Sequence, residues 1–556
     1  MLTLKKTTLI FTLLVVPLLA KEVTLNFIHI GDLHGHLIPR DHVTVGDVQV
    51  KQGGLAYLYS AIDEVRKKDS DAILVNTGDT VQGGAEALYT RGEAMINVLN
   101  HFGIDYGALG NWDHLYGEAR TAEIFFNKDK LANWTSLTSN VYSKKTGKTV
   151  SKPYEIFIRK GIKIGIIGFT SERPAMAVGP SGFDEVTFTN GDKEFAAHVK
   201  TLRPQVDLLV VISELGLAKN IKLAEEVEGV DFIFSSDMHE ITTKEVILPN
   251  GTVVVEEGQD GTRMGHMKVF MKDNKLAGHA FKMRTIDVNI KPNEKIQALI
   301  DKERMKFNSD KEAQKHVSQF SNKALKGDIT KTIGKTKIDL HRSNFSDAKE
   351  MNAVIEGSSH NFIAEVFRKE SGADLGLLRG FRYGTHVKAG DIQREDMFHY
   401  IPISPWVGVG KIKGAKLLKY LDKVAYGSLT SDPSNWGGGW HHVVSGLKYS
   451  LNPNAKKGEY ISDVRVLQDG KYIPFDPNKT YTVAGYTYNE ELNKINKIPM
   501  EDVTLMVDKD NNPLEAYEVI ENYLKSHDAN PELNRIKLTE PLLKPTHKNR
   551  EIQPLH

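Results

Sequence analysis

The stretch Phe27-Ile-His-Ile-Gly-Asp-Leu-His-Gly-His36 decides the fold that we expect for this chain. It reads as an apolar strand that runs into a turn carrying Asp32 and His34. Side chains two residues apart along an extended chain point to the same side, so a carboxylate and an imidazole are presented together. Buried parallel strands often carry binding sites at their carboxyl ends. The stretch alone also fits a hydrogen-bonded turn, and four later strand ends decide between the two readings.

Four later apolar runs, which alternate with helical patterns, also end in polar residues. This alternation predicts a largely parallel, buried sheet, whose strand ends meet at one edge. Together with the first run, these runs place seven candidate ligands just after strand-like segments: Asp32, His34, Asp79, Asn111, Glu214, Asp237 and His239.

The donor chemistry of this set points to divalent metal ions. Cysteine is absent from the chain, which excludes disulfides, thiolate ligands and a cysteine nucleophile. Seven oxygen and nitrogen donors are too many for one ion and suit two ions that share a carboxylate. Asp79, in the middle of the order, is the bridge that we expect. We predict two divalent ions, Mn²⁺ before Zn²⁺ or Fe, which would stabilise a displacement at a tetrahedral anionic centre.

Composition limits the remaining classes of function. The formal net charge of +1 gives no argument for binding a nucleic acid polymer. Residues 1–20 combine Lys5 and Lys6 with an apolar run that is shorter than the roughly 20 residues of a membrane span. We therefore predict a signal peptide over 1–20, a periplasmic protein and no stable membrane span after cleavage, with an uncleaved anchor as the alternative.

The length of 556 residues predicts more than one domain. A charged segment of helical pattern over 292–328 is the expected connection between domains. Before it, residues 21–291 would form the dinuclear metal hydrolase domain. After it, residues 329–543 would form a substrate domain of mixed helices and strands, followed by a flexible polar tail over 544–556.

The order of the motifs resembles the calcineurin-like metallophosphoesterases, in the branch that contains the 5′-nucleotidases and the SoxB thiosulfohydrolases. This resemblance implies an α/β protein, with an N-terminal αββα sandwich and a C-terminal 5′-nucleotidase-like α+β domain. It implies one metal held by Asp32, His34 and His239, a bridging Asp79, and a second metal completed by Asn111, Glu214 and Asp237.

Three positions depart from the phosphoesterase pattern. Trp112 stands where the family has a histidine that helps the leaving group depart. Glu214 and Asp237 replace two metal-binding histidines, so the second site would be rich in carboxylate and would favour a hard ion such as Mn²⁺. Either carboxylate could instead lie behind the ligands and orient them.

A segment in the second half resembles the SoxB branch more than the nucleotidases. Gly380-Phe-Arg-Tyr-Gly384 is similar to the Gly-Phe-Arg-Trp-Gly of SoxB proteins. Arg382 could take two sulfonate oxygens with its guanidinium fork, or could form an interdomain salt bridge. Phe381 and Tyr383 would line the substrate beside it.

Three residues near the metal motifs are further candidates. Trp112 and His36 would face the substrate, although His36 could equally lie behind the ligands. His114 could supply an acid, or could pair with Asp113 or face solvent. The expected catalytic residues are therefore Asp79, Asn111, His114 and Arg382.

The resemblance implies a hydrolase that cleaves a cysteine S-thiosulfonate on a SoxYZ-like sulfur carrier protein and releases sulfate during thiosulfate oxidation. A persulfide leaves as a weakly basic anion and needs little protonation. A site with Trp112 in place of the family's histidine is therefore better suited to this reaction than to phosphoester hydrolysis. A 5′-nucleotidase or 2′,3′-cyclic nucleotide phosphodiesterase is the alternative. A non-catalytic binding protein on the same fold is a second alternative.

Overall fold

The computed structural model describes residues 22–41, 50–174, 183–341, 355–379, 386–403, 405–430, 432–433, 435, 441–488 and 491–541. The predicted signal peptide over 1–20 and the predicted tail over 544–556 both lie outside these ranges. So does the segment 380–385, which carries Phe381, Arg382 and Tyr383. Among the described residues, no helix combines the length and the apolar character that crossing a membrane requires.

The N-terminal lobe contains two six-stranded sheets. The first has the order β14-β13-β1-β2-β3-β4, with β1 to β4 parallel and β13 antiparallel to β1. Its strands are β1 (Glu22–Ile30), β2 (Ile73–Asn76), β3 (Tyr106–Gly107), β4 (Thr135–Ser136), β13 (Arg263–Lys272) and β14 (Lys275–Thr285).

The second sheet has the order β11-β12-β10-β9-β7-β6, with β7, β9, β10 and β12 parallel. Its strands are β6 (Tyr154–Arg159), β7 (Ile162–Phe169), β9 (Leu208–Ser213), β10 (Phe232–Ser235), β11 (Val246–Ile247) and β12 (Val253–Glu256). A short antiparallel pair, β5 (Val141–Ser143) and β8 (Val186–Phe188), lies outside both sheets.

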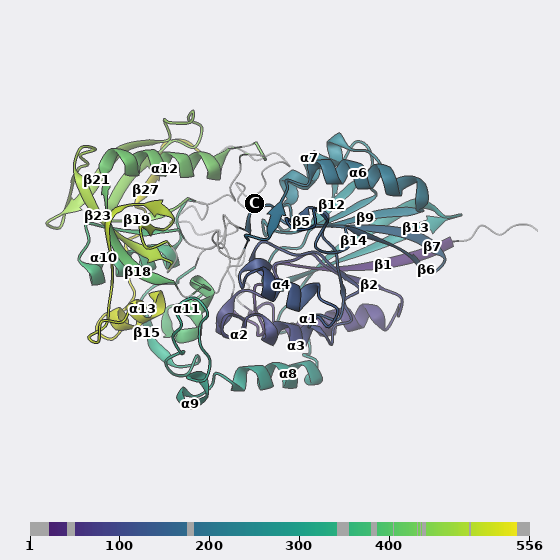
Figure 1. Ribbon diagram of the computed structural model, residues 1–556, viewed down its shortest axis with the longest axis horizontal. Helices are drawn as coiled ribbons and strands as arrows, with labels where there is room; N and C mark the ends of the chain where they lie inside the picture. The colour runs from purple at the N-terminus through teal and green to yellow at the C-terminus, as the bar shows by residue number, and fades with distance from the viewer. Residues whose placement is uncertain are drawn as a thin grey trace, which may run out of the picture.

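The alternation of side chains along β1 explains the sandwich. Phe27 points into the core between the two sheets, where its ring centroid lies 5.7 Å from that of Phe234. Ile28 points to the other face, under the helices α1 (Leu55–Arg66) and α3 (Glu93–Leu99). The outer face of the second sheet is covered in the same way by α6 (Asp192–Leu202) and α7 (Leu217–Glu226). The predicted αββα sandwich is confirmed (Figure 1).

The C-terminal lobe is the predicted α+β domain. A five-stranded sheet has the order β19-β16-β23-β18-β26, and a four-stranded sheet has the order β22-β21-β20-β27. Their strands are β16 (Leu375–Leu378), β18 (Trp406–Lys413), β19 (Val443–Ser445), β20 (Leu447–Leu451), β21 (Ile461–Gln468), β22 (Lys471–Pro474), β23 (Thr480–Thr487), β26 (Glu501–Leu505) and β27 (Ile536–Leu538). The longer helices of this lobe are α10 (Ser358–Ser371), α12 (Gly414–Leu429) and α13 (Ala516–Leu524).

The segment predicted as a helical connection is helical only in its first half. Helix α8 (Glu294–Met305) buries Ile296 and Ile300 against the N-terminal lobe, and α9 (Asp310–Ala313) is one turn long. From Gln314 the chain makes turns until β15 (Thr332–Thr336) pairs with β17 (Gly390–Gln393). Asn322 and Gly327 have left-handed backbone (φ 55° and 84°), which a right-handed helix cannot contain, so no helix continues through this segment.

The two lobes meet through packed side chains and buried ion pairs. Figure 1 shows them side by side, and α2 (Gly84–Tyr89) contacts α11 (Arg394–Tyr400) where they meet. Arg40 binds Glu395 and Asp396, each at 2.9 Å, and Arg304 binds Glu395 at 2.9 Å and also Glu86. Burial alone would raise the pKa of Glu395, but the guanidinium groups of Arg40 and Arg304 hold it below its usual value.

Removing one partner of this network should destabilise the protein. Arg304→Met leaves Glu86 and Glu395 buried with less compensating charge, so we expect a loss of about 3–5 kcal/mol in the free energy of unfolding. The exposed pair Lys411–Asp502 provides the matched control, and Lys411→Met should cost at most about 1 kcal/mol. Denaturant unfolding checks both values, and equal losses for the two variants would contradict the role of the network.

The same network predicts a pH dependence. Because the pKa of Glu395 is lowered in the folded state, its ionised form contributes stability above its ordinary pKa. That contribution is lost as the pH falls through the lowered value. The stability difference between the wild type and Arg304→Met should therefore narrow in acid, and a difference that grows in acid would contradict the assignment.

Candidate metal centre

The seven predicted ligands lie at the carboxyl ends of parallel strands from both sheets, and all seven are buried. The loops after β1, β2 and β3 carry Asp32, His34, Asp79 and Asn111, and the loops after β9 and β10 carry Glu214, Asp237 and His239.

Five of the seven have left-handed backbone, which non-glycine residues adopt rarely. They are Asp32 (φ 44°), His34 (φ 44°), Asp79 (φ 46°), Asp237 (φ 89°) and His239 (φ 61°). Backbone hydrogen bonds between the first two loops hold this conformation, from the Asp32 N–H to Gly78 O and from the His34 N–H to Asp79 O, both at 2.9 Å. Backbone strain of this kind is typical of functional sites.

Asp32, His34 and His239 form the first cluster. The two Nε2 atoms of the histidines lie 2.9 Å apart. Oδ1 of Asp32 lies 3.7 Å from Nε2 of His34 and 3.8 Å from Nε2 of His239. One oxygen and two nitrogens that converge at these distances could hold a divalent ion. Oδ2 of Asp79 lies 3.9 Å from Nε2 of His34, within reach of the same ion.

Asp32, Asp79 and Glu214 form a second cluster. Burial raises the pKa of all three carboxyl groups well above the usual value. Neighbouring carboxylates raise it further, with Asp79 acting on both Asp32 and Glu214, and Asp113 acting on Asp79. Both Glu214 oxygens and Oδ1 of Asn111 are buried and accept no hydrogen bond from any described donor. Converging carboxylates and donor-free oxygens fit a second cation, so the donor set suits two ions. Asp32 reaches both clusters, and the bridging role of Asp79 stays a prediction.

The Asp237 carboxylate belongs to neither of these two clusters, and two other side chains hold it. Its Oδ2 forms an ion pair with Arg173, and its Oδ1 accepts a hydrogen bond from Nδ2 of Asn111 at 3.3 Å. Sequence reasoning missed Arg173. The available signal was its position after β7, a parallel strand of the second sheet to which the prediction assigned no site residue.

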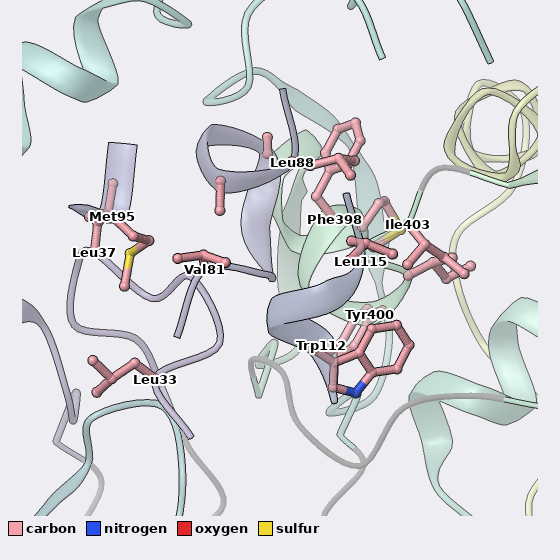
Figure 2. Close-up of a cluster of buried hydrophobic side chains, with 14 of the residues drawn as sticks. Leu33, Leu37, Val81, Leu88, Met95, Trp112, Leu115, Phe398, Tyr400 and Ile403 are labelled. Atoms are coloured by element: carbon pink, nitrogen blue, oxygen red, sulfur yellow. The ribbon is translucent and has the colours of Figure 1, made fainter. Parts of the chain in front are cut away.

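Trp112 and Asp113 fix the loops that carry Asp79 and Asn111. The backbone N–H of Trp112 donates to Oδ1 of Asp79 at 2.8 Å. The Trp112 indole is buried in an apolar cluster with Leu115, Tyr400 and Ile403, so it packs against the C-terminal lobe (Figure 2). The Asp113 carboxylate accepts backbone hydrogen bonds at the start of both loops, from Thr80, Val81 and Gly110.

The structure places the two other candidate histidines in specific contacts. Nδ1 of His114 lies 2.8 Å from Oε1 of Glu118, and its ring meets Phe188 edge-on. These contacts point to a packed structural role for His114, and its proposed role as an acid stays untested. His36 packs against His399 of the C-terminal lobe, with ring centroids 4.3 Å apart, and therefore lies between the lobes.

Two family models match the two lobes. Residues 25–240 match the calcineurin-like phosphoesterases, and residues 332–494 match the 5′-nucleotidase C-terminal domain. The N-terminal lobe is a calcineurin-like phosphoesterase domain, and the C-terminal lobe is a 5′-nucleotidase C-terminal domain. The predicted superfamily is thus confirmed.

Individual relatives are distant but extend over most of the chain. The protein UshA of Yersinia enterocolitica is 23% identical, covering 91% of this chain and 92% of UshA. A 5′-nucleotidase of Vibrio parahaemolyticus is also 23% identical, over 90% and 89% of the two chains. Only the Vibrio relative is named for an activity, that of a 5′-nucleotidase, so these two relatives do not confirm the predicted SoxB specificity.

Solved structures support the fold of both lobes. The sulfate thiohydrolase SoxB of Thermus thermophilus superposes with a TM-score of 0.76 at 18% identity, covering 94% of this chain and 98% of SoxB. A 5′-nucleotidase precursor from the same organism superposes with a TM-score of 0.74 at 21% identity, covering 93% and 100%. At this level of identity the similarity establishes a shared fold, and it does not distinguish sulfur from phosphate chemistry.

A methyl group at Gly110 should disrupt the centre. A Cβ atom there would lie 1.9 Å from Oδ1 of Asp79, so Gly110→Ala must displace that carboxylate. We expect weaker metal binding and about 100-fold lower activity, because small displacements of catalytic groups are costly. Gly427→Ala, in open space on α12, is the matched control and should leave both unchanged. If Gly110→Ala kept the metal content and the turnover of the wild type, this geometry would be contradicted.

Proposed function

We propose that the chain is a divalent-metal-dependent hydrolase that cleaves a phosphoester of a nucleotide bound between the two lobes. The observation that carries this proposal is the buried carboxylate–histidine centre, with donor-free oxygens on Asn111 and Glu214. The 5′-nucleotidase C-terminal domain supports a nucleotide as the substrate. Export from the cytoplasm, expected from residues 1–20, remains part of the proposal.

The chain's own residues supply the framework for this reaction. Asp32, His34 and His239 would hold one ion, while Asp79, Asn111 and Glu214 would hold the other. Two divalent ions supply a nucleophilic hydroxide and neutralise charge on the phosphoryl oxygens. The strained loops hold the donors in fixed positions, so little reorganisation is needed when charge develops during the reaction.

Position 112 supplies no acid for the leaving group. Trp112 stands where the family pattern has a histidine, and an indole N–H does not transfer its proton at ordinary pH. The rate should therefore depend strongly on the basicity of the leaving group. Substrates with weakly basic leaving groups should be cleaved well, whereas ordinary alcohols should leave slowly.

The same observation favours a second candidate, hydrolysis of a cysteine S-thiosulfonate on a SoxYZ-like carrier protein. A persulfide is a weakly basic leaving group, so Trp112 costs this reaction less than it costs phosphoester hydrolysis. The shared fold with SoxB is compatible with this candidate. We rank it second because sequence relatives from two Vibrio species are named 5′-nucleotidases.

Restoring a histidine at position 112 tests the leaving-group argument. Trp112→His should raise AMP hydrolysis about tenfold or more, and should change p-nitrophenyl phosphate hydrolysis much less. Trp112→Phe is the matched control, because it changes the ring without adding an acid. Equal effects of the two variants on both substrates would contradict the argument.

A direct comparison of substrates separates the candidate functions. The Mn²⁺-loaded protein would be offered AMP, a 2′,3′-cyclic nucleotide and a peptide bearing a cysteine S-thiosulfonate. Phosphate release from AMP, or ring opening of the cyclic nucleotide, supports the first candidate. Sulfate release alone establishes the second. If the metal-loaded protein cleaved none of these substrates, the alternative of a non-catalytic binding protein would be favoured.

A further inference from the structure

We propose that the ion pair between Arg173 and Asp237 persists when metal is bound and keeps the Asp237 carboxylate out of metal coordination. The second ion would then rest on Asp79, Asn111 and Glu214. This inference presupposes the metal-dependent hydrolase proposed above. It assigns Asp237 a positioning role at a place where the family pattern has a metal ligand.

Both oxygens of Asp237 are engaged by protein donors. Oδ2 pairs with the guanidinium of Arg173, and Oδ1 accepts from Nδ2 of Asn111 at 3.3 Å. The Asp237 side chain is 4% exposed and that of Arg173 is 16% exposed, so solvent screens the pair only weakly. A charge-assisted pair of this kind is strong, and leaving one partner alone in a buried site is costly.

The backbone of Asp237 takes part in the centre while its carboxylate binds Arg173 and Asn111. Its N–H donates to Oδ2 of Asp32 at 3.1 Å, which orients a ligand of the first ion. The left-handed backbone of Asp237 permits this N–H contact together with the ion pair to Arg173. Asp237 therefore contributes a donor to the centre instead of a ligand.

The contact with Asp237 also fixes which end of the Asn111 amide faces the ions. A carboxylate only accepts hydrogen bonds, so Asn111 must turn its NH₂ group toward Asp237. Its Oδ1 is then directed to the opposite side, where it is buried and receives no hydrogen bond from the described residues. That oxygen is the natural ligand that Asp237 positions.

Removing the pair as a unit tests the proposal. Metal-free protein would be titrated with Mn²⁺ by calorimetry, and bound metal would be counted by mass spectrometry. The double variant Arg173→Met/Asp237→Asn should still bind two ions, with the weaker affinity changed less than about tenfold. Loss of one ion would show that Asp237 is a ligand and would overturn the proposal. Glu214→Gln is the positive control, which should lose one ion.

Wild-type protein separates this inference from the proposed function. If it binds no Mn²⁺, the hydrolase proposal itself fails. If it binds two ions and the double variant binds one, only the inference fails.

Crystals of the Mn²⁺-loaded wild type provide the test if the double variant does not fold. They should show Asp237 hydrogen-bonded to Arg173 and outside the coordination sphere of both ions. An Asp237 oxygen within about 2.5 Å of an ion would overturn the proposal.

Discussion

The burial of three carboxylates in one place, those of Asp32, Asp79 and Glu214, is the constraint on which the rest of this structure depends. Burial raises the pKa of each group and neighbouring carboxylates raise it further, so the ionised cluster needs positive charge to persist. The imidazoles of His34 and His239 meet beside this cluster, and the guanidinium of Arg173 compensates the negative charge of Asp237. The two sheets pack so that the carboxyl ends of their parallel strands bring these groups together, and the strained loops hold them in place.

The centre is mechanically connected to the C-terminal lobe. The Trp112 backbone holds Asp79, whereas the Trp112 ring packs against Tyr400 and Ile403 of the other lobe. The buried ion pairs of Arg40 and Arg304 also join the two lobes. A substrate held by the C-terminal lobe would therefore be presented to the ions in a defined orientation, and such positioning lowers the barrier to reaction.

The sequence predicted the sandwich and the positions of the strand ends, because apolar periodicity is a local property. The strand predicted just before Asp32 is β1, which ends at Ile30, whereas the helical pattern beyond α9 is interrupted by left-handed backbone at Asn322 and Gly327. The orientation of Asp237 could not be predicted, since it depends on Arg173, which lies 64 residues away in sequence. The same holds for His36, whose ring contact comes from the other lobe.

The central claim is that this carboxylate–histidine centre binds two divalent ions on which hydrolysis depends. The most direct test measures the metal content of the purified wild type together with AMP hydrolysis, before chelation, after chelation and after return of Mn²⁺. The account predicts about two ions per chain, loss of activity on chelation and recovery when Mn²⁺ is restored. Less than one ion per chain, with activity that survives chelation, would contradict it.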